Sequence, residues 1–255
     1  MPSPRTAIIG AGISGLTAGK MLSDYAVDYT CFESSDRIGG NWAFGNPNGL
    51  SSAYRSLHID TSKHRLSFKD FPIPADFPAF PHHSDIKRYL DDYADAFDLL
   101  ENIEFNNGVV RARRLGAGWE IEDQADAVRE FDLLVVGNGH HWDARMADFP
   151  GTFTGEVMHS HHYVDPHTPL ELTGKRILVV GIGNSAQGRF GCLAVGCHGP
   201  ADLHFGTGAD ELQPAAALGR VGGQRPIVAA SPRRHHHYLE VTIPGVHVVV
   251  AVARL

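Results

Sequence analysis

The sequence predicts an α/β fold built on parallel strands, because it carries two glycine-rich loops of the kind that bind dinucleotides. The first loop covers residues 10–15 and follows the apolar run 7–9; the second covers residues 181–186 and follows the apolar run 177–180. An apolar strand that leads through such a loop into a helix is typical of a Rossmann-like βαβ unit. Two loops predict two dinucleotide sites, an arrangement suited to hydride transfer between cofactors.

The first loop reads Gly-Ala-Gly-Ile-Ser-Gly, and each glycine has its own purpose. Gly10 permits the tight turn, Gly12 lets the backbone approach a pyrophosphate, and Gly15 lets the helix pack close to the strand. The expected strand covers residues 5–9, and the expected helix covers residues 16–22. The N-terminus of that helix presents unpaired N–H groups and a positive dipole to the phosphate.

A carboxylate follows the first loop at the distance expected of a ribose-binding acid. The second expected strand, residues 27–32, ends at Glu33, roughly 20 residues beyond the loop. Glu33 can accept hydrogen bonds from the ribose diol, and its charge disfavours a 2′-phosphate. The residues themselves therefore predict FAD or NAD at this site, and not NADP.

Composition excludes several other classes of protein. The 255 residues are 43% hydrophobic and 20% charged, as in ordinary globular proteins. A net charge of −7 without a dense Lys/Arg stripe disfavours nucleic-acid binding. No apolar stretch reaches the ~18 residues of a membrane span. The N-terminus leads directly into the first expected strand, and the three cysteines form no Cys-x-x-Cys pair. We therefore expect a cytoplasmic protein with no signal peptide.

Other patterns have structural interpretations. The 16 histidines include adjacent pairs and a triplet at 235–237, but none has the spacing of two metal ligands on one helix, so we expect no metal site. Apolar residues at helical spacing predict a core-facing helix over residues 84–100. Alternation around Trp119 predicts a strand of a small meander.

Five segments, in order along the chain, resemble the flavin-containing monooxygenase family. An acidic residue leads into a Gly-Gly-x-Trp turn, a later segment has the form Phe-x-Gly-x-x-x-His-x-x-x-Tyr, and the second loop reads Gly-Ile-Gly-Asn-Ser-Ala. The matching segments are residues 33–42, residues 56–63 with 70–72, residues 131–142, residues 153–163 and residues 181–186. The chain is identified as a member of this family on these motifs.

The resemblance implies three parts of the chain. Residues 1–165 would form a Rossmann-like FAD-binding domain with a parallel sheet. Residues 166–186 would form a linker and the first strand and loop of a second, incomplete Rossmann NADP-binding domain. Residues 187–255 would be an aberrant tail of weak pattern, loosely packed or disordered.

The resemblance also implies the chemistry, which uses FAD, NADPH and O2. NADPH would reduce the flavin, O2 would add to it, and the flavin hydroperoxide would oxygenate a soft nitrogen or sulfur centre, or a carbonyl, of a small molecule. A flavin disulfide reductase is set aside because no redox cysteine pair is present. The sequence does not identify the substrate, and it leaves a homo-oligomer open.

Individual site residues follow from the same resemblance. Asp60 is the catalytic candidate, since it would lie beside the flavin ring, and His159 would tie the two domains together. The residues implied to hold FAD are Gly10, Gly12, Ser14, Gly15, Glu33, Gly40, Asn41, Trp42, Asp60 and Thr61. The residues implied to hold NADPH are Gly181, Gly183, Asn184, Ser185 and Ala186.

The chain departs from the family pattern at two of these motifs. Asp60 stands where many members carry Asn, and Val164 stands where the family has Lys or Arg. An ionised Asp60 would place a negative charge beside the flavin, whereas burial would favour its neutral form.

The tail is a third departure. A helix should follow Ala186, but residues 187–255 show no helical period and contain no lysine. We interpret the tail as the product of a frame shift near residue 187, with a divergent native tail as the alternative. Residues 246–252 read as an apolar strand prone to pairing with other chains. Without that helix the second loop would lose its phosphate donors, so the alternative function is a non-catalytic FAD-binding remnant.

Overall fold

The computed structural model describes residues 3–146, 153–173, 175 and 177–180, and the backbone of residues 203–206 and 248–251. The chain divides into two compact units. The first unit comprises Met1–Ala53 and His58–Asp143, and the second comprises Tyr54–Leu57 and Ala144–Leu255. Both units contain parallel strands, which confirms the expected α/β class.

A four-stranded parallel sheet forms the centre of the first unit. Its strands are β1 (Thr6–Ile9), β2 (Tyr29–Phe32), β3 (Ile103–Glu104) and β7 (Leu133–Val136), in the order β3-β2-β1-β7. Ile8 of β1 lies in register with Cys31 on one side and Val135 on the other. Because β1 is central and leads into a helix, the carboxyl end of the sheet presents the first glycine-rich loop.

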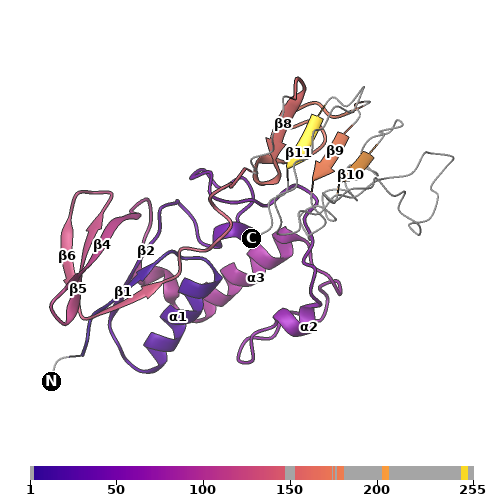
Figure 1. The fold of residues 1–255 in the computed structure, drawn as a ribbon. Coiled ribbons are helices and arrows are strands. Elements are labelled where there is room, and N and C mark those ends of the chain that lie inside the picture. Colours follow the sequence, from indigo (N-terminus) through magenta and orange to yellow (C-terminus); the bar gives the residue numbers. More distant parts are fainter. Residues whose placement is uncertain are drawn as a thin grey trace. The chain divides into compact units, whose positions relative to one another are not determined.

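Helices cover one face of this sheet, as Figure 1 shows. They are α1 (Ile13–Asp24) and α3 (His83–Ala96). Their buried side chains form the main core with Ile8 and Cys31, and this core includes Leu16, Ile86, Tyr89, Leu90 and Tyr93. Helix α3 ends four residues before the expected boundary at residue 100, since Asp98 adopts a left-handed backbone conformation with a φ of 52°.

An antiparallel meander covers the opposite face. It consists of β4 (Val109–Leu115), β5 (Gly118–Asp123) and β6 (Val128–Phe131), in the order β4-β5-β6. A small cluster of Ala7, Phe32, Ile121 and Phe131 joins the meander to the sheet. Ala7 and Phe32 point away from the helices because successive side chains in a strand face opposite ways. The meander predicted around Trp119 is therefore confirmed.

Short helical segments complete the described parts. The α-helical turn α2 covers Lys63–Leu66. The 3-10 helices are η1 (Gly40–Trp42), η2 (Leu99–Asn102) and η3 (Ser160–His162). No helix among the described residues has the length and apolar character needed to cross a membrane.

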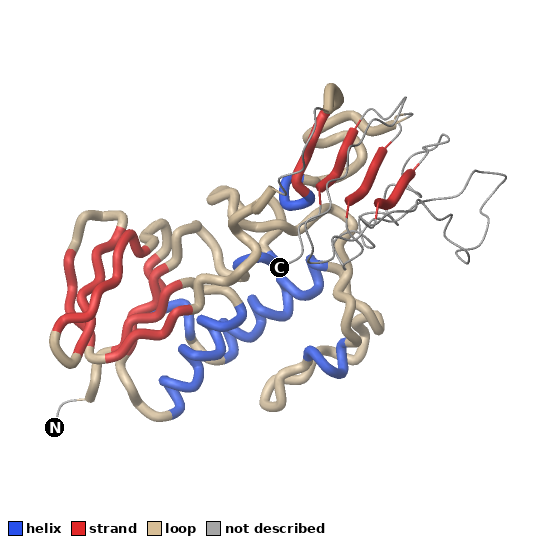
Figure 2. The backbone as a smooth tube through the Cα atoms, in the orientation of Figure 1, coloured by secondary structure: helices blue, strands red, loops and turns tan. Residues whose placement is uncertain are grey.

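The second unit has its own parallel sheet, which Figure 2 shows in red. Its strands are β8 (Glu156–His159), β9 (Ile177–Val180), β10 (Leu203–Gly206) and β11 (Val248–Ala251), in the order β10-β9-β11-β8. Strand β9 is the one that the apolar run before the second loop predicts, and all four of its residues are buried. Strand β11 lies within the expected strand 246–252 and pairs with β8 and β9 of the same chain.

The unit boundary differs from the expected domain boundary. We expected the first domain to extend to residue 165, but residues from Ala144 onward belong to the second unit, together with Tyr54–Leu57. Residues 54–57 join this unit because Arg55 pairs with residues that follow β8: its N–H donates to the Val164 carbonyl at 2.9 Å, and its guanidinium binds Asp165 at 2.9 Å. The assignment of the units to FAD and NADP stays a prediction.

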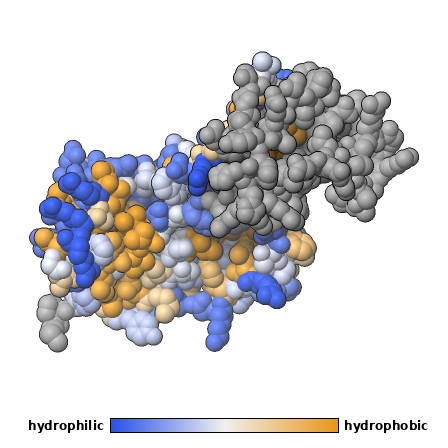
Figure 3. Space-filling view, in the orientation of Figure 1, coloured by the Kyte–Doolittle hydropathy of each residue, from blue (hydrophilic) through white to orange (hydrophobic). Residues whose placement is uncertain are grey.

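Among the strands that the structure describes, β7 is an edge strand of the first sheet, but it has the composition of an interior strand. Its residues are Leu-Leu-Val-Val, a continuous apolar run of the kind found in strands buried on both faces. Leu133 is 48% exposed and Val136 is 62% exposed. Figure 3 shows hydrophobic surface on the face of the first unit turned to the viewer, where β1 and its neighbours lie in Figure 1. The sheet therefore presents an apolar edge.

Candidate dinucleotide-binding site

The turn after β1 brings three chain segments into close contact. The Gly10 N–H donates to the Phe32 carbonyl at 2.8 Å, and Gly10 has a φ of 90°. A Cβ at Gly10 would lie 2.7 Å from the Gly137 carbonyl oxygen. Both the positive φ and this close approach require glycine at position 10.

Gly15 and Gly12 satisfy different requirements, although they lie in the same loop. A Cβ at Gly15 would lie 1.8 Å from the carbonyl oxygen of Gly10, so the helix could not pack against the loop. A Cβ at Gly12 would meet Gly40 Cα at 3.7 Å, an ordinary contact. Protein packing therefore requires glycine at position 15 but not at position 12.

The N-terminus of α1 presents amides without intrahelical acceptors next to Gly12. An α-helix leaves its first four N–H groups without intrahelical acceptors. Gly12, the N-cap residue, gives no side-chain cap, and the first turn contains no acidic residue. Within the described residues, the amides of residues 12–15 have no acceptor, and the first that bonds back is that of Leu16, to the Gly12 carbonyl at 3.0 Å. Such amides, at the positive end of the helix dipole, suit an anion.

Glu33 lies against the loop, as its position after β2 predicts. The side chain is only 5% exposed. Its Oε2 accepts the Ala11 N–H at 2.7 Å, and its Oε1 accepts the Ser35 N–H at 2.9 Å. The sequence predicted the place of Glu33 but not these bonds to the protein's own backbone.

The Gly-Gly turn closes the loop from another side. Gly39 donates its N–H to the Ala11 carbonyl at 3.0 Å, and both Gly39 and Gly40 have positive φ. A Cβ at Gly40 would lie 3.1 Å from Gly12 Cα. The structure thus brings Gly40 beside the loop, and its contact with FAD stays a prediction.

Asn41 and Trp42 have structural contacts of their own. Asn41 Oδ1 accepts hydrogen bonds from the Ser52 N–H and hydroxyl, both at 2.9 Å. Trp42 is partly buried against the main core. Their contact with a cofactor stays a prediction.

The segment implied to lie beside the flavin ring is held to the start of α3. The Ile59 N–H donates to the Pro81 carbonyl at 3.0 Å, and the Thr61 hydroxyl donates to Asp60 Oδ1 at 3.2 Å. Both side chains are exposed. The catalytic role of Asp60 stays a prediction.

The Phe-x-Gly-x-x-x-His-x-x-x-Tyr motif forms β8 and η3 in the second unit. His159 Nδ1 accepts the His161 N–H at 3.0 Å, which places the proton of a neutral ring on Nε2. Tyr163 is buried against Tyr54, with ring centroids 6.0 Å apart. The role of His159 in tying domains together stays a prediction.

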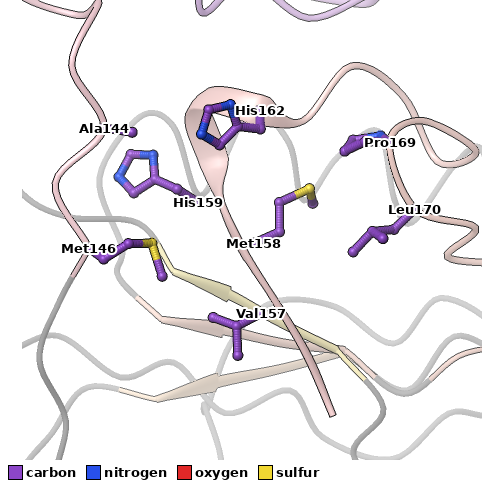
Figure 4. Close-up of a pocket in the computed structure, with 8 residues that line it drawn as sticks. All are labelled: Ala144, Met146, Val157, Met158, His159, His162, Pro169 and Leu170. Carbon is purple, nitrogen blue, oxygen red and sulfur yellow. The ribbon is translucent and has the colours of Figure 1, made fainter.

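A cavity of about 430 Å³ opens beside this motif (Figure 4). It is lined by Ala144, Met146, Val157, Met158, His159, His162, Pro169 and Leu170. Within the residues that the structure describes, no group of three His, Cys, Asp or Glu side chains is placed to hold a metal ion.

The predicted NADPH loop lies outside the described residues. The residues concerned are Gly181, Gly183, Asn184, Ser185 and Ala186. The structure describes the strand that leads to them, β9, and its neighbours in the sheet.

Sequence reasoning missed three contributors to the first site. Gly137 lies behind Gly10, and its N–H donates to the Ile9 carbonyl at 2.8 Å. Ser34 and Asn48 form a hydrogen-bonded chain that ends at Glu33. The glycine directly after the apolar run of β7 was a signal for Gly137, but no local pattern indicated Ser34 or Asn48.

Comparison with known proteins shows which family this chain is similar to. A family model described as "Flavin-binding monooxygenase-like" matches residues 3–194. Flavin-containing monooxygenase 5 of Mus musculus is 38% identical over 199 residues, which cover 72% of this chain and 37% of the mouse protein. Dimethylaniline monooxygenase [N-oxide-forming] 2 of Oryctolagus cuniculus is 39% identical over 197 residues, covering 72% of this chain and 36% of the rabbit protein.

Solved structures show the same fold. S-allyl-L-cysteine S-oxygenase from Allium sativum superposes with a TM-score of 0.80 at 24% identity, over 98% of this chain and 62% of that chain. Steroid monooxygenase bound to NADP superposes with a TM-score of 0.60 at 25% identity, over 80% of this chain and 38% of that chain. The match to the curated relatives spans little more than a third of their length. The chain belongs to the flavin-binding monooxygenase-like family.

Proposed function

We propose that the first unit binds FAD and that the chain derives from, or forms part of, an NADPH-dependent flavin monooxygenase. The observation that carries this proposal is the set of amides of residues 12–15 at the N-terminus of α1, which have no acceptor among the described residues. A dinucleotide pyrophosphate is an anion of the right chemistry for these donors.

The residues around the loop fit the other parts of the cofactor. Glu33 lies at the end of the neighbouring strand, where a ribose diol would donate to its carboxylate. Gly40, directly opposite Gly12, leaves no side chain in the path of the pyrophosphate. FAD would supply the redox chemistry and the activation of O2, while the described residues bind and orient it.

The relatives support a small-molecule substrate with a soft nucleophilic centre. The rabbit relative is named for N-oxide formation, and the garlic structure is that of an S-oxygenase. A structure of OTEMO contains both FAD and NADP. We therefore propose a nitrogen or sulfur centre as the site of oxygenation, with NADPH as the reductant and O2 as co-substrate.

A second candidate is a non-catalytic FAD-binding remnant. Among the strands that the structure describes, β7 has no neighbour on its outer side, and its residues Leu133 and Val136 are 48% and 62% exposed. In this candidate the first loop would still hold FAD, while the second loop would lack a working NADPH site.

The visible absorption spectrum of the purified chain, recorded without oxygen before and after NADPH is added, separates the two candidates. Flavin absorption that bleaches with NADPH supports the monooxygenase. Flavin absorption that persists supports the remnant. A chain that neither retains nor takes up FAD contradicts both.

A further inference from the structure

Ala11 is held at both of its polar backbone atoms, although the loop around it contains three glycines. Its N–H donates to Glu33 Oε2 at 2.7 Å, and its carbonyl accepts the Gly39 N–H at 3.0 Å. The residue itself is fully buried. Glycine-rich chain has many accessible conformations, so these two bonds select one of them.

Glu33 is itself fixed by further hydrogen bonds. Oε1 accepts the Ser35 N–H at 2.9 Å and the Ser34 hydroxyl at 3.4 Å. The Asn48 side-chain amide donates to the Ser34 hydroxyl oxygen at 3.1 Å. The chain Asn48–Ser34–Glu33–Ala11 therefore joins the turn at residues 46–49 to the glycine-rich loop.

We propose that Glu33 is a positioning residue that fixes the glycine-rich loop in its binding geometry before any ligand arrives, with Ser34 and Asn48 as its supports. The inference deepens the proposed function, since it rests on the same loop being the pyrophosphate site. A loop held in its bound conformation loses less conformational entropy on binding. The unbonded amides of residues 12–15 would then already be aligned when the anion binds, so the loop would lose less conformational entropy on binding.

Because Glu33 is charged, the direction in which pyrophosphate affinity changes distinguishes a positioning role from a purely electrostatic one. A carboxylate near an anion site repels the anion. If charge were its only effect, removing the carboxylate should therefore strengthen pyrophosphate binding. If Glu33 positions the loop, its removal should weaken the binding instead. A contact with ribose alone predicts no weakening for a probe that has no ribose.

The test uses the full chain without FAD and inorganic pyrophosphate as the probe. The dissociation constant is read from the amide NMR shifts of residues 12–15, and hydrogen exchange is measured at the Ala11 amide. Glu33→Gln should raise the dissociation constant about tenfold, as expected for the loss of one charge-assisted hydrogen bond, and should speed exchange at Ala11. The matched control, Asp36→Asn, removes a nearby carboxylate that pairs with Arg37, and should do neither.

Two results would overturn the proposal. One is a Glu33→Gln variant that binds pyrophosphate as tightly as the wild type, or more tightly. The other is unchanged exchange at Ala11. If the wild type does not bind pyrophosphate, the proposed FAD site is contradicted, and Ala11 exchange alone decides whether Glu33 fixes the loop.

A second variant covers the case in which Glu33→Gln does not fold. Asn48→Ala keeps the charge of Glu33 and removes only the far end of the chain. It should weaken pyrophosphate binding about twofold, because the lost hydrogen bond joins two neutral side chains and acts on the loop only through Ser34 and Glu33. It should also speed exchange at Ala11. No change in either measurement would contradict the support that Asn48 gives.

Discussion

The two compact units contain parallel sheets of the same size, and in both sheets the central strand pairs with one near and one distant strand of the chain. In the first unit, β1 lies between β2, which follows α1 directly, and β7 from residues 133–136. In the second unit, β9 lies between β10 and β11, which come from residues 203–206 and 248–251. Strands next to a glycine-rich loop can therefore be located from its motif, whereas the distant strand of each sheet, β7 or β11, is placed by pairing across the chain.

The largest expected effect comes from filling the space between helix and loop in the first unit. Gly15→Ala would place a Cβ 1.8 Å from the Gly10 carbonyl oxygen, so we expect a loss of at least about 4 kcal/mol in the free energy of unfolding. Urea unfolding measures this loss.

Gly12→Ala is the matched variant in the same loop. Its Cβ makes an ordinary contact in the protein, so stability should change by less than about 1 kcal/mol. The methyl group would lie beside the amides that we propose to bind the pyrophosphate, so FAD binding should weaken more than about tenfold, or 1.4 kcal/mol. Equal destabilisation by both variants would refute the distinction between the two glycines.

The next effect contrasts an interior strand of the second unit with the edge strand of the first. Leu178 of β9 is 4% exposed, and Leu178→Ala should cost about 2–5 kcal/mol. Leu133→Ala in β7 should change stability by no more than about 0.5 kcal/mol, because half of that side chain is already exposed. Hydrogen exchange resolved by segment measures both. A large loss from Leu133→Ala would show that β7 is covered in solution.

An ion-pair cluster between sheet and meander gives a further test of the first unit. Arg129 binds Glu104 and Asp123, each at 2.7 Å, and Asp123 is 1% exposed. Arg129→Met would leave a buried carboxylate without its cation. We expect a loss of about 3 kcal/mol, the low end of the range for a broken buried pair, since Arg129 itself is partly exposed. Calorimetry measures this loss of stability, and an unchanged melting temperature would contradict the prediction.

The same cluster sets a dependence on pH. The Arg129 guanidinium lowers the pKa of Glu104. Burial acts to raise the pKa of Asp123, but hydrogen bonds from Asn107, the Ala127 N–H and Arg129 outweigh it and lower that pKa. Carboxyl groups with lowered pKa stabilise the folded state fully above their unfolded pKa values, and this stabilisation is lost as pH falls below about 4.

The expected observation is a steeper loss of stability on acidification in the wild type than in Arg129→Met. Chemical denaturation between neutral pH and pH 3 would measure it. Parallel curves for the two proteins would contradict this assignment.

Much of the first unit could be predicted from the sequence because its signals are local. The Gly-x-Gly-x-x-Gly pattern located β1 and α1, the apolar alternation located β5, and the distance from the loop located Glu33. The end of α3 was predicted less well, because it depends on the left-handed backbone of Asp98 rather than on apolar spacing.

Other parts could not be predicted because they depend on contacts between distant residues. The hydrogen bond from Asn48 to Ser34 joins two loops that carry no motif. The pairing of Arg55 with Asp165 moves residues 54–57 into the second unit, and no local pattern indicates it.

The most direct test of the central claim, that the loop at residues 10–15 is an FAD site, is co-elution of flavin with the chain. The wild type and Gly12→Ala would each be incubated with FAD and passed through a gel-filtration column. We expect close to one flavin per wild-type chain and little on the variant, with both proteins folded. Flavin retained equally by both, or by neither, would contradict the claim.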